Sequence, residues 1–327
     1  MSGDDGMEPL RHAPGPHPDW NESYYFVFSD TRSGLNGMTR LGFKPNKNEA
    51  MTFLLLFLPD GRVAGFQAVE EMGLAWPRGQ LRVAGMSHER WADGSWVYSF
   101  RGRMVVVGEP EEFPKIGGHP ELIRETLPAS MDISFAPINE TYEYARHMIQ
   151  ESLRFGRRSG DEHWEQIALS RGRITLGGET YELRDVMSQR DHTHGVRDWT
   201  GVGDWLYYVV WFNPGLAINP AAIVLEDGGV STGGFLFRGG RNVPLRTIRV
   251  IDQRFRDRII PVSSTLEIED AEGVRHILRA RAGPAVPLPF RDGSGKVSVL
   301  AQCFGSFELD GLGGGYGSYE TLRVKRG

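Results

Sequence analysis

The sequence predicts an all-β protein made of two consecutive antiparallel β-barrel or β-sandwich units. Runs of aromatic and β-branched residues recur along the chain with turn residues between them, a pattern typical of short strands. The 42 glycines and 19 prolines favour many tight turns. A chain of 327 residues also exceeds the size at which one core stops growing comfortably, so two units are expected.

The first unit is expected over residues 20–170, after a flexible arm at residues 1–19 that has almost no apolar content. Pro-Asp-Gly at 59–61 and Ala-Asp-Gly at 92–94 tolerate the positive φ angles of hairpin turns, which predicts antiparallel neighbours. One helix is expected at 140–155, where apolar residues recur at roughly helical spacing. Strands are predicted at 24–28, 51–58, 62–69, 80–85, 96–101 and 104–107.

The second unit is expected over residues 171–327, although no clean internal repeat relates it to the first. Its strands are predicted at 172–176, 179–183, 205–212, 221–226, 234–237, 247–251, 265–268, 276–280 and 297–308. Short antiparallel strands remove their unpaired edges by closing into barrels or sandwiches, and a small barrel can hold one ligand. A cavity for an apolar small molecule is favoured over a solid core, which the same aromatic residues would fill equally well.

Composition excludes several kinds of partner. The net charge is −5 and no basic stretch stands out, so nucleic-acid binding is not expected. The longest apolar run, at 51–58, is far shorter than the roughly 18 residues of a membrane-spanning helix. Cys303 is the single cysteine and the first twenty residues lack a secretion signal, so the cytoplasm is the expected compartment. A homodimer is compatible with these features.

The densest polar cluster lies at residues 189–199 and reads Gln-Arg-Asp-His-Thr-His-Gly-Val-Arg-Asp-Trp. If this stretch is extended, the two-residue period puts Asp191 and Thr193 on one face and the basic residues at 190, 192 and 194 on the other. Gly195 would then allow a bend or bulge. One of the two faces would line the cavity.

This cluster has the groups needed for acid–base chemistry. Burial in an apolar barrel raises the pKa of a carboxyl group, so Asp191 is a candidate proton donor. His192 could relay the proton, while Arg197 and Asp198 orient the pair or hold an oxygen of the ligand. The alternative interpretation is structural: the two aspartates form ion pairs with neighbouring arginines and tie the units together.

His192 and His194 also form a His-x-His pair, which could grip one metal ion as in cupin barrels. Asp198 and His276 could complete such a site, but no second cupin motif is present. No metal is therefore expected in the preferred interpretation. The glycine-rich stretch at 311–317 lacks the ending of a phosphate-binding loop, so no nucleotide cofactor is expected either.

A smaller cluster, His-Trp-Glu-Gln at 163–166, places His163 and Glu165 on one face of an extended segment. An imidazole and a carboxyl could therefore face the same cavity as Asp191, or the cluster could cap a strand. Candidate ligand-binding residues are His163, Glu165, Gln189, His194 and Trp199.

The clusters at 163–166 and 189–199, with the intervening 172–181, resemble bacterial two-domain proteins distantly akin to carotenoid 1,2-hydratase (hydroxyneurosporene synthase) and to lipocalin-like hydratases and cyclases. In those relatives the central string is Arg-Asp-His-Ser-Trp-Gly followed by Arg-Asp, whereas Thr193 and His194 stand here in place of Ser and Trp. The resemblance extends from about Trp20 onward. It implies two lipocalin-like barrels and chemistry on an alkene in an apolar cavity without a nucleotide cofactor.

Three functions follow as hypotheses. The first is a cofactor-independent lyase, hydratase or isomerase that acts on a hydrophobic terpenoid, steroid or aromatic compound. The second is a carrier of a hydrophobic ligand, in which the segment 189–199 only clamps the two units together. The third is a cupin-like metal-dependent enzyme that uses His192 and His194.

Overall fold

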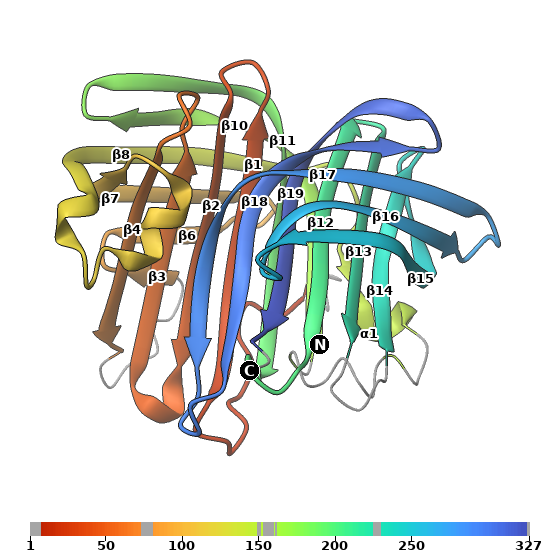
Figure 1. Cartoon of the computed structure of the whole chain (residues 1–327), viewed down its shortest axis with the longest axis horizontal. Coiled ribbons are helices and arrows are strands. Elements are labelled where there is room, and N and C mark those ends of the chain that lie inside the picture. Colours follow the sequence, from red (N-terminus) through yellow and green to blue (C-terminus); the bar gives the residue numbers. More distant parts are fainter. Residues whose placement is uncertain are drawn as a thin grey trace.

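The computed structural model describes residues 8–72, 81–148, 152, 160, 162–224 and 230–325, and it confirms the all-β fold. Two antiparallel sheet units lie side by side (Figure 1). The helices with described bounds are short: η1 (Pro45–Lys47), η2 (Pro110–Lys115), η3 (Pro120–Leu122) and α1 (Tyr144–His147). Only one turn of the helix expected at 140–155 is seen, and most of the remainder of that stretch lies outside the described residues. Within the described ranges, no helix is long and apolar enough to cross a membrane.

The first unit is a sheet in the order β4-β3-β2-β1-β11-β10-β8-β7-β6-β5, and β4 also pairs with β7, so that eight strands form a ring. Its strands are β1 (Trp20–Asp30), β2 (Leu35–Lys44), β3 (Glu49–Phe57), β4 (Val63–Glu71), β5 (Leu81–Val83), β6 (Met86–Arg90), β7 (Trp96–Val107), β8 (Ile123–Pro137), β9 (Tyr142–Glu143), β10 (Glu162–Leu176) and β11 (Glu179–Val196).

The turns predicted at 59–61 and 92–94 join antiparallel strands, β3 to β4 and β6 to β7. Gly61 and Gly94 have φ angles of 91° and 80°, which glycine adopts without a steric penalty. The strands expected at 96–101 and 104–107 are two parts of the single strand β7.

The second unit is a closed eight-stranded barrel in which each strand pairs with the next and β19 returns to β12. Its strands are β12 (Asp204–Asn213), β13 (Leu216–Val224), β14 (Val230–Arg238), β15 (Arg241–Arg256), β16 (Ile260–Asp270), β17 (Arg275–Arg291), β18 (Val297–Leu309) and β19 (Leu312–Val324).

Strands β10 and β11 belong to the first sheet, where they fill the space between β1 and β8. The expected division at residue 170 therefore falls within β10, and the change from one sheet to the other lies between Val196 and Asp204. The hairpin formed by β10 and β11 belongs to the first unit because its backbone groups need β1 on one side and β8 on the other as hydrogen-bonding partners.

The N-terminal segment, defined here as residues 8–19, is bonded to the inside of the first unit, in contrast to the flexible arm expected there. Glu8 is buried and lies 2.6 Å from the guanidinium of Arg190. The hydroxyl of Tyr24 donates a hydrogen bond to the carbonyl of Leu10. Specific polar contacts hold most of this segment in place, and Leu10 also packs against the core of the first unit.

Strand β1 is buried along its whole length because it contacts a core on each face. Tyr24, Phe26 and Phe28 belong to the core of the first unit. Tyr25 and Val27 belong to a second core, which they share with residues of the second unit such as Val209 and Trp211. The uninterrupted aromatic run at 24–28 is thus a strand covered on both sides.

We expect Val27→Ala to lower the free energy of unfolding by about 2 kcal/mol, because it removes two buried methyl groups from the shared core. The matched control is Val69→Ala: Val69 also lies on a strand but is 59% exposed, whereas Val27 is 0% exposed. That control should change stability by less than about 0.5 kcal/mol. Denaturant unfolding measures both, and equal losses would contradict a core between the units.

Candidate active site

A cavity of about 1190 Å³ is lined by residues of both units. This exceeds the roughly 300–1,000 Å³ of ordinary small-molecule sites. Its walls are largely apolar, and they include Met38, Met51, Phe53, Leu55, Phe66, Val105 and Phe113 of the first unit and Leu288, Phe290 and Leu300 of the second. A bulky hydrophobic compound would lose most of its contact with water here.

Polar groups reach this cavity from one face of the adjacent strands β1, β10 and β11. The pairing places Tyr25 opposite Asp191 and Asp191 opposite Glu165, while His163 lies opposite Thr193. Directly opposed side chains on one face of a sheet lie about 4.5–5.5 Å apart at Cβ, so this register gathers the groups into one patch. The two-residue period predicted for Asp191 and Thr193 is confirmed, and both side chains line the cavity.

The centre of the patch is an ion pair between His163 and Asp191. Nε2 of His163 lies 2.6 Å from Oδ2 of Asp191 and 3.2 Å from Oε1 of Glu165. Thr193 donates a hydrogen bond of 2.8 Å to the other oxygen of Asp191. Burial disfavours charge on His163, but the two carboxylates outweigh it and raise its pKa to about 10.

The pKa of Asp191 is shifted in the opposite direction. Burial alone would raise its pKa, but the charge and hydrogen bond of His163, the charge of Arg197 and the hydrogen bond from Thr193 lower the pKa to about 2. At neutral pH the pair is therefore an imidazolium next to a carboxylate. Asp191 is ionised there and holds no proton to donate.

Glu165 lies directly behind the pair and is fully buried. The hydroxyl of Tyr144 donates a hydrogen bond to it at 3.1 Å, and Nε2 of Gln189 donates another at 2.7 Å. Burial raises the pKa of Glu165. Gln189 also contacts the hydroxyl of Tyr207, so this network runs from β10 and β11 to β12 of the second unit.

A second group of charges faces the cavity from other strands. Glu320 of β19 accepts a hydrogen bond of 3.2 Å from the indole of Trp205. Burial raises the pKa of Glu320 to about 7; the negative charge of Asp191 adds to this effect, and the guanidinium groups of Arg197 and Arg40 oppose it. A carboxyl group that titrates near neutral pH in an apolar cavity suits general acid–base chemistry.

Arg40 of β2 also lines the cavity, where one guanidinium nitrogen lies 3.4 Å from the sulfur of Met51. Burial and the neighbouring charge of Arg197 lower its pKa to about 9. Two guanidinium groups close enough to affect each other form a positive region on the cavity wall. An oxygen or a negative charge of a ligand would be stabilised there.

The remaining candidates of the segment 189–199 are divided between two places. Arg197, Asp198 and Trp199 line the cavity from the linker between the units. Trp199 stacks on Phe290 with ring centroids 4.4 Å apart and is covered by the guanidinium of Arg197. Asp198 accepts hydrogen bonds from the backbone of residues 200 and 201, so it shapes the linker turn.

His192 and His194 point away from the cavity, as the two-residue period requires. Nε2 of His192 donates a hydrogen bond of 2.9 Å to Glu22, and its ring stacks on Tyr24 inside the first unit. The geometry therefore does not bring His192 to Asp191 as a relay. His276, considered for a cupin-like metal site, lies in the second barrel, where it contacts Asp270 and Asp310.

Sequence reasoning missed Arg40, Tyr144, Tyr207 and Glu320. These residues are far apart in sequence: strand pairing within the first sheet brings Arg40 near Asp191 through Tyr25, and the packing of the second unit adds Tyr207 and Glu320. One signal was available for Glu320, which is the first charged residue of the strand Leu312–Val324 and follows a run of uncharged residues. A carboxyl group that follows several buried uncharged residues indicates a special environment.

This architecture, a closed antiparallel barrel next to a second eight-stranded ring, defines a two-barrel lipocalin-like protein. The chain belongs to the family described as Domain of unknown function (DUF7064), whose model matches residues 7–325. No curated protein matches its sequence.

Solved structures share the fold at low sequence identity. An AttH-like protein from Nitrosomonas europaea is 14% identical, with a TM-score of 0.59 over 98% of this chain and 99% of that one. CghA is 12% identical, with a TM-score of 0.56 over 93% and 87% of the two chains. Kievitone hydratase from Nectria haematococca is 10% identical, with a TM-score of 0.50 over 93% and 88%. The expected distant relation to lipocalin-like hydratases is thus confirmed at the level of the fold.

The ion pair of His163 and Asp191 predicts how stability depends on pH. The pKa of His163 is raised from 6.5 to about 10, so its contribution is complete below pH 6.5 and is lost as the pH rises towards 10. Asp191 contributes above pH 3.8 and loses its contribution as the pH falls towards 2. Between pH 7 and 9 we expect the free energy of unfolding to fall by about 2 kcal/mol from this pair.

Asp191→Asn should remove most of that pH dependence, because His163 then loses its main negative partner. Asp185→Asn is the control, since Asp185 forms an exposed ion pair with Arg171 and should leave the slope unchanged. Urea unfolding at several pH values measures the effect. Identical slopes in the wild type and in Asp191→Asn would contradict the proposed charge state.

Proposed function

We propose that this protein is a cofactor-independent acid–base enzyme, a hydratase (hydro-lyase) or isomerase, that acts on a hydrophobic small molecule in the cavity between the two units. The observation that carries the proposal is the pairing of an apolar cavity of about 1190 Å³ with ionisable groups of strongly shifted pKa on its wall. Such groups cluster at functional sites more often than in structural ion pairs alone. The fold shared with kievitone hydratase is compatible with this reaction class.

We assign the proton transfer to Glu320 rather than to Asp191. A pKa of about 7 lets Glu320 both donate and accept a proton near neutral pH, whereas Asp191 is fully ionised there. In a hydration, the proton of Glu320 forms a new C–H bond as the carbon–carbon π bond breaks. A water molecule then forms the C–O bond, and the proton that it releases restores the carboxyl group of Glu320.

His163 and Asp191 have a positioning role in this scheme. Asp191 and Glu165 hold the imidazolium of His163 at the cavity wall, where it can donate a hydrogen bond to an oxygen of the substrate. This hydrogen bond would orient the double bond of the substrate relative to Glu320. Arg40 and Arg197 offer a second place for a substrate oxygen on the same wall.

The proposed substrate class follows from the same walls. Large apolar and aromatic side chains favour a terpenoid, a steroid or an aromatic compound, and the guanidinium groups favour one that carries at least one oxygen.

Turnover can be tested in D₂O with a panel of compounds of these classes that contain a carbon–carbon double bond. Mass spectrometry would detect hydration as the addition of one D₂O and isomerisation as deuterium incorporation.

For any compound that reacts, we expect Glu320→Gln to lower kcat by at least about 100-fold, because the amide cannot supply the proton. Affinity should change little, since the amide keeps the size of the side chain. Glu308→Gln is the matched control, because Glu308 lies on the neighbouring strand β18 in an exposed ion pair with Arg279. Binding without any chemical change in the wild type, across the panel, would instead support a carrier of hydrophobic ligands.

The pH profile gives an independent check of Glu320. Its protonated form is the required donor, so kcat/KM for hydration should fall as the pH rises through about 7. Removing the positive charges that oppose this shift, as in Arg40→Met, should move the midpoint upward. A profile that is flat from pH 6 to 8 would exclude Glu320 as the proton donor.

A further inference from the structure

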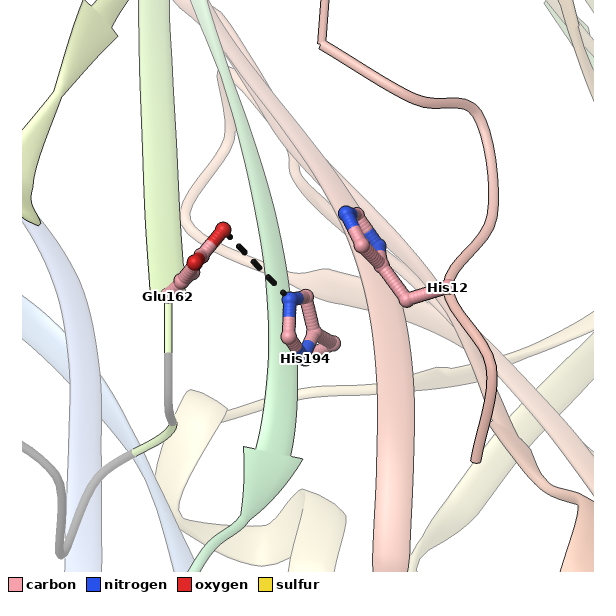
Figure 2. A group of neighbouring side chains, drawn as sticks. All are labelled: His12, Glu162 and His194. Atoms are coloured by element: carbon pink, nitrogen blue, oxygen red, sulfur yellow. Dashed lines mark ion pairs between the residues drawn. The ribbon is translucent and has the colours of Figure 1, made fainter. Parts of the chain in front are cut away.

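A second group of imidazole and carboxylate side chains lies where the N-terminal segment meets strands β10 and β11. Glu162 and His194 are directly opposed on these strands, and His12 approaches them from the segment that precedes β1 (Figure 2). One ligand atom of each residue lies within 4.8 Å of the others. Glu162 also lies on the cavity wall, whereas His12 and His194 do not, so two of the three side chains lie outside the proposed reaction centre.

His12 is held with one ring nitrogen free to act as a ligand. Its Nδ1 lies 2.8 Å from one oxygen of Glu22, and its backbone N–H donates to the other oxygen at 3.2 Å. A carboxylate oxygen accepts hydrogen bonds, so Nδ1 of His12 is the donor in this contact, and the other ring nitrogen, Nε2, is the one that could bind a metal ion.

His194 has unused bonding capacity in a buried place. Neither of its ring nitrogens has a hydrogen-bond partner among the described residues, although both are shielded from solvent. Its Nε2 lies 3.7 Å from Oε2 of Glu162, as the dashed line in Figure 2 shows. That separation is too long for a hydrogen bond but close to the roughly 3.4 Å between two ligands of one tetrahedral Zn²⁺ ion.

We propose that His12, Glu162 and His194 bind one divalent transition metal ion, Zn²⁺ in particular, which ties the N-terminal segment to β10 and β11. Two imidazoles and a carboxylate are a normal zinc donor set and leave a fourth position for water. Glu22 behind His12 supplies the carboxylate–histidine contact that usually orients a metal-binding imidazole. The donor pair differs from the His-x-His pair of the sequence, because Nε2 of His192 is bonded to Glu22.

Binding requires the three side chains to draw together. The rings of His12 and His194 are stacked with centroids 3.9 Å apart and an interplanar angle of 29°, so rotations about their side-chain bonds must turn the nitrogens towards the ion. Glu162 supplies the negative charge that partly compensates the ion.

The test is a Zn²⁺ titration of the full-length, untagged protein after treatment with a chelator, followed with a competing chromophoric chelator. We expect one Zn²⁺ per chain in the wild type. Affinity should fall at least tenfold in Glu162→Gln and in His194→Gln, since each loses a direct ligand. His119→Gln should bind as the wild type does, because His119 is 62% exposed and pairs only with Glu121 in the described structure.

Two further measurements keep the test independent of folding defects. Glu162 is partly exposed, so Glu162→Gln should retain the wild-type circular dichroism spectrum and carries the test if His194→Gln is unstable. Zn²⁺ should raise the melting temperature and slow tryptic cleavage after Arg11 in the wild type but not in Glu162→Gln. Absence of stoichiometric Zn²⁺, or equal affinity in the wild type and Glu162→Gln, would overturn the proposal whatever the outcome of the activity assays.

Discussion

The two-residue period of strands β1, β10 and β11 is the constraint on which the rest of the structure depends. Where β10 and β11 pair between residues 162–170 and 186–194, the strands are largely buried, so their side chains there must suit either the interior of the first unit or the cavity beside the second unit. Asp191 faces the cavity and His192 faces Glu22. A shift of one residue in pairing would exchange the two sets and leave unpaired charges in both places.

Buried charges have different surroundings on the two faces of these strands. Inside the first unit Glu8 has the guanidinium of Arg190 as a close partner, and Glu22 accepts hydrogen bonds from His12 and His192. Such partners offset the desolvation of the buried carboxylates. On the cavity side the charges instead leave Glu320 near its titration point, with a pKa of about 7. The interior face thus fixes the structure, while the cavity face retains groups that can change protonation state.

Strands β2, β6 and β8 were not predicted, but local chemistry was enough to predict most of the other strands, the hairpin turns at Gly61 and Gly94, and the division of residues 190–194 between two faces. These features depend only on neighbours in the sequence. Which face lines the cavity depends on where the second unit packs, and no local pattern encodes that. Glu320 and Arg40 come close to Asp191 from strands far away in the chain. The bonding of the N-terminal segment was missed because it depends on individual charges rather than on apolar content.

The origin of each group also indicates how rigid it is. His163 and Asp191 lie on adjacent paired strands, and a group held by a strand keeps its position better than one on a loop. Arg197 and Trp199 come from the linker between the units, which has no ladder partner on either side. In the proposed enzyme the rigid ion pair would therefore fix the orientation of one end of the substrate, while the linker would adapt to the rest of its shape.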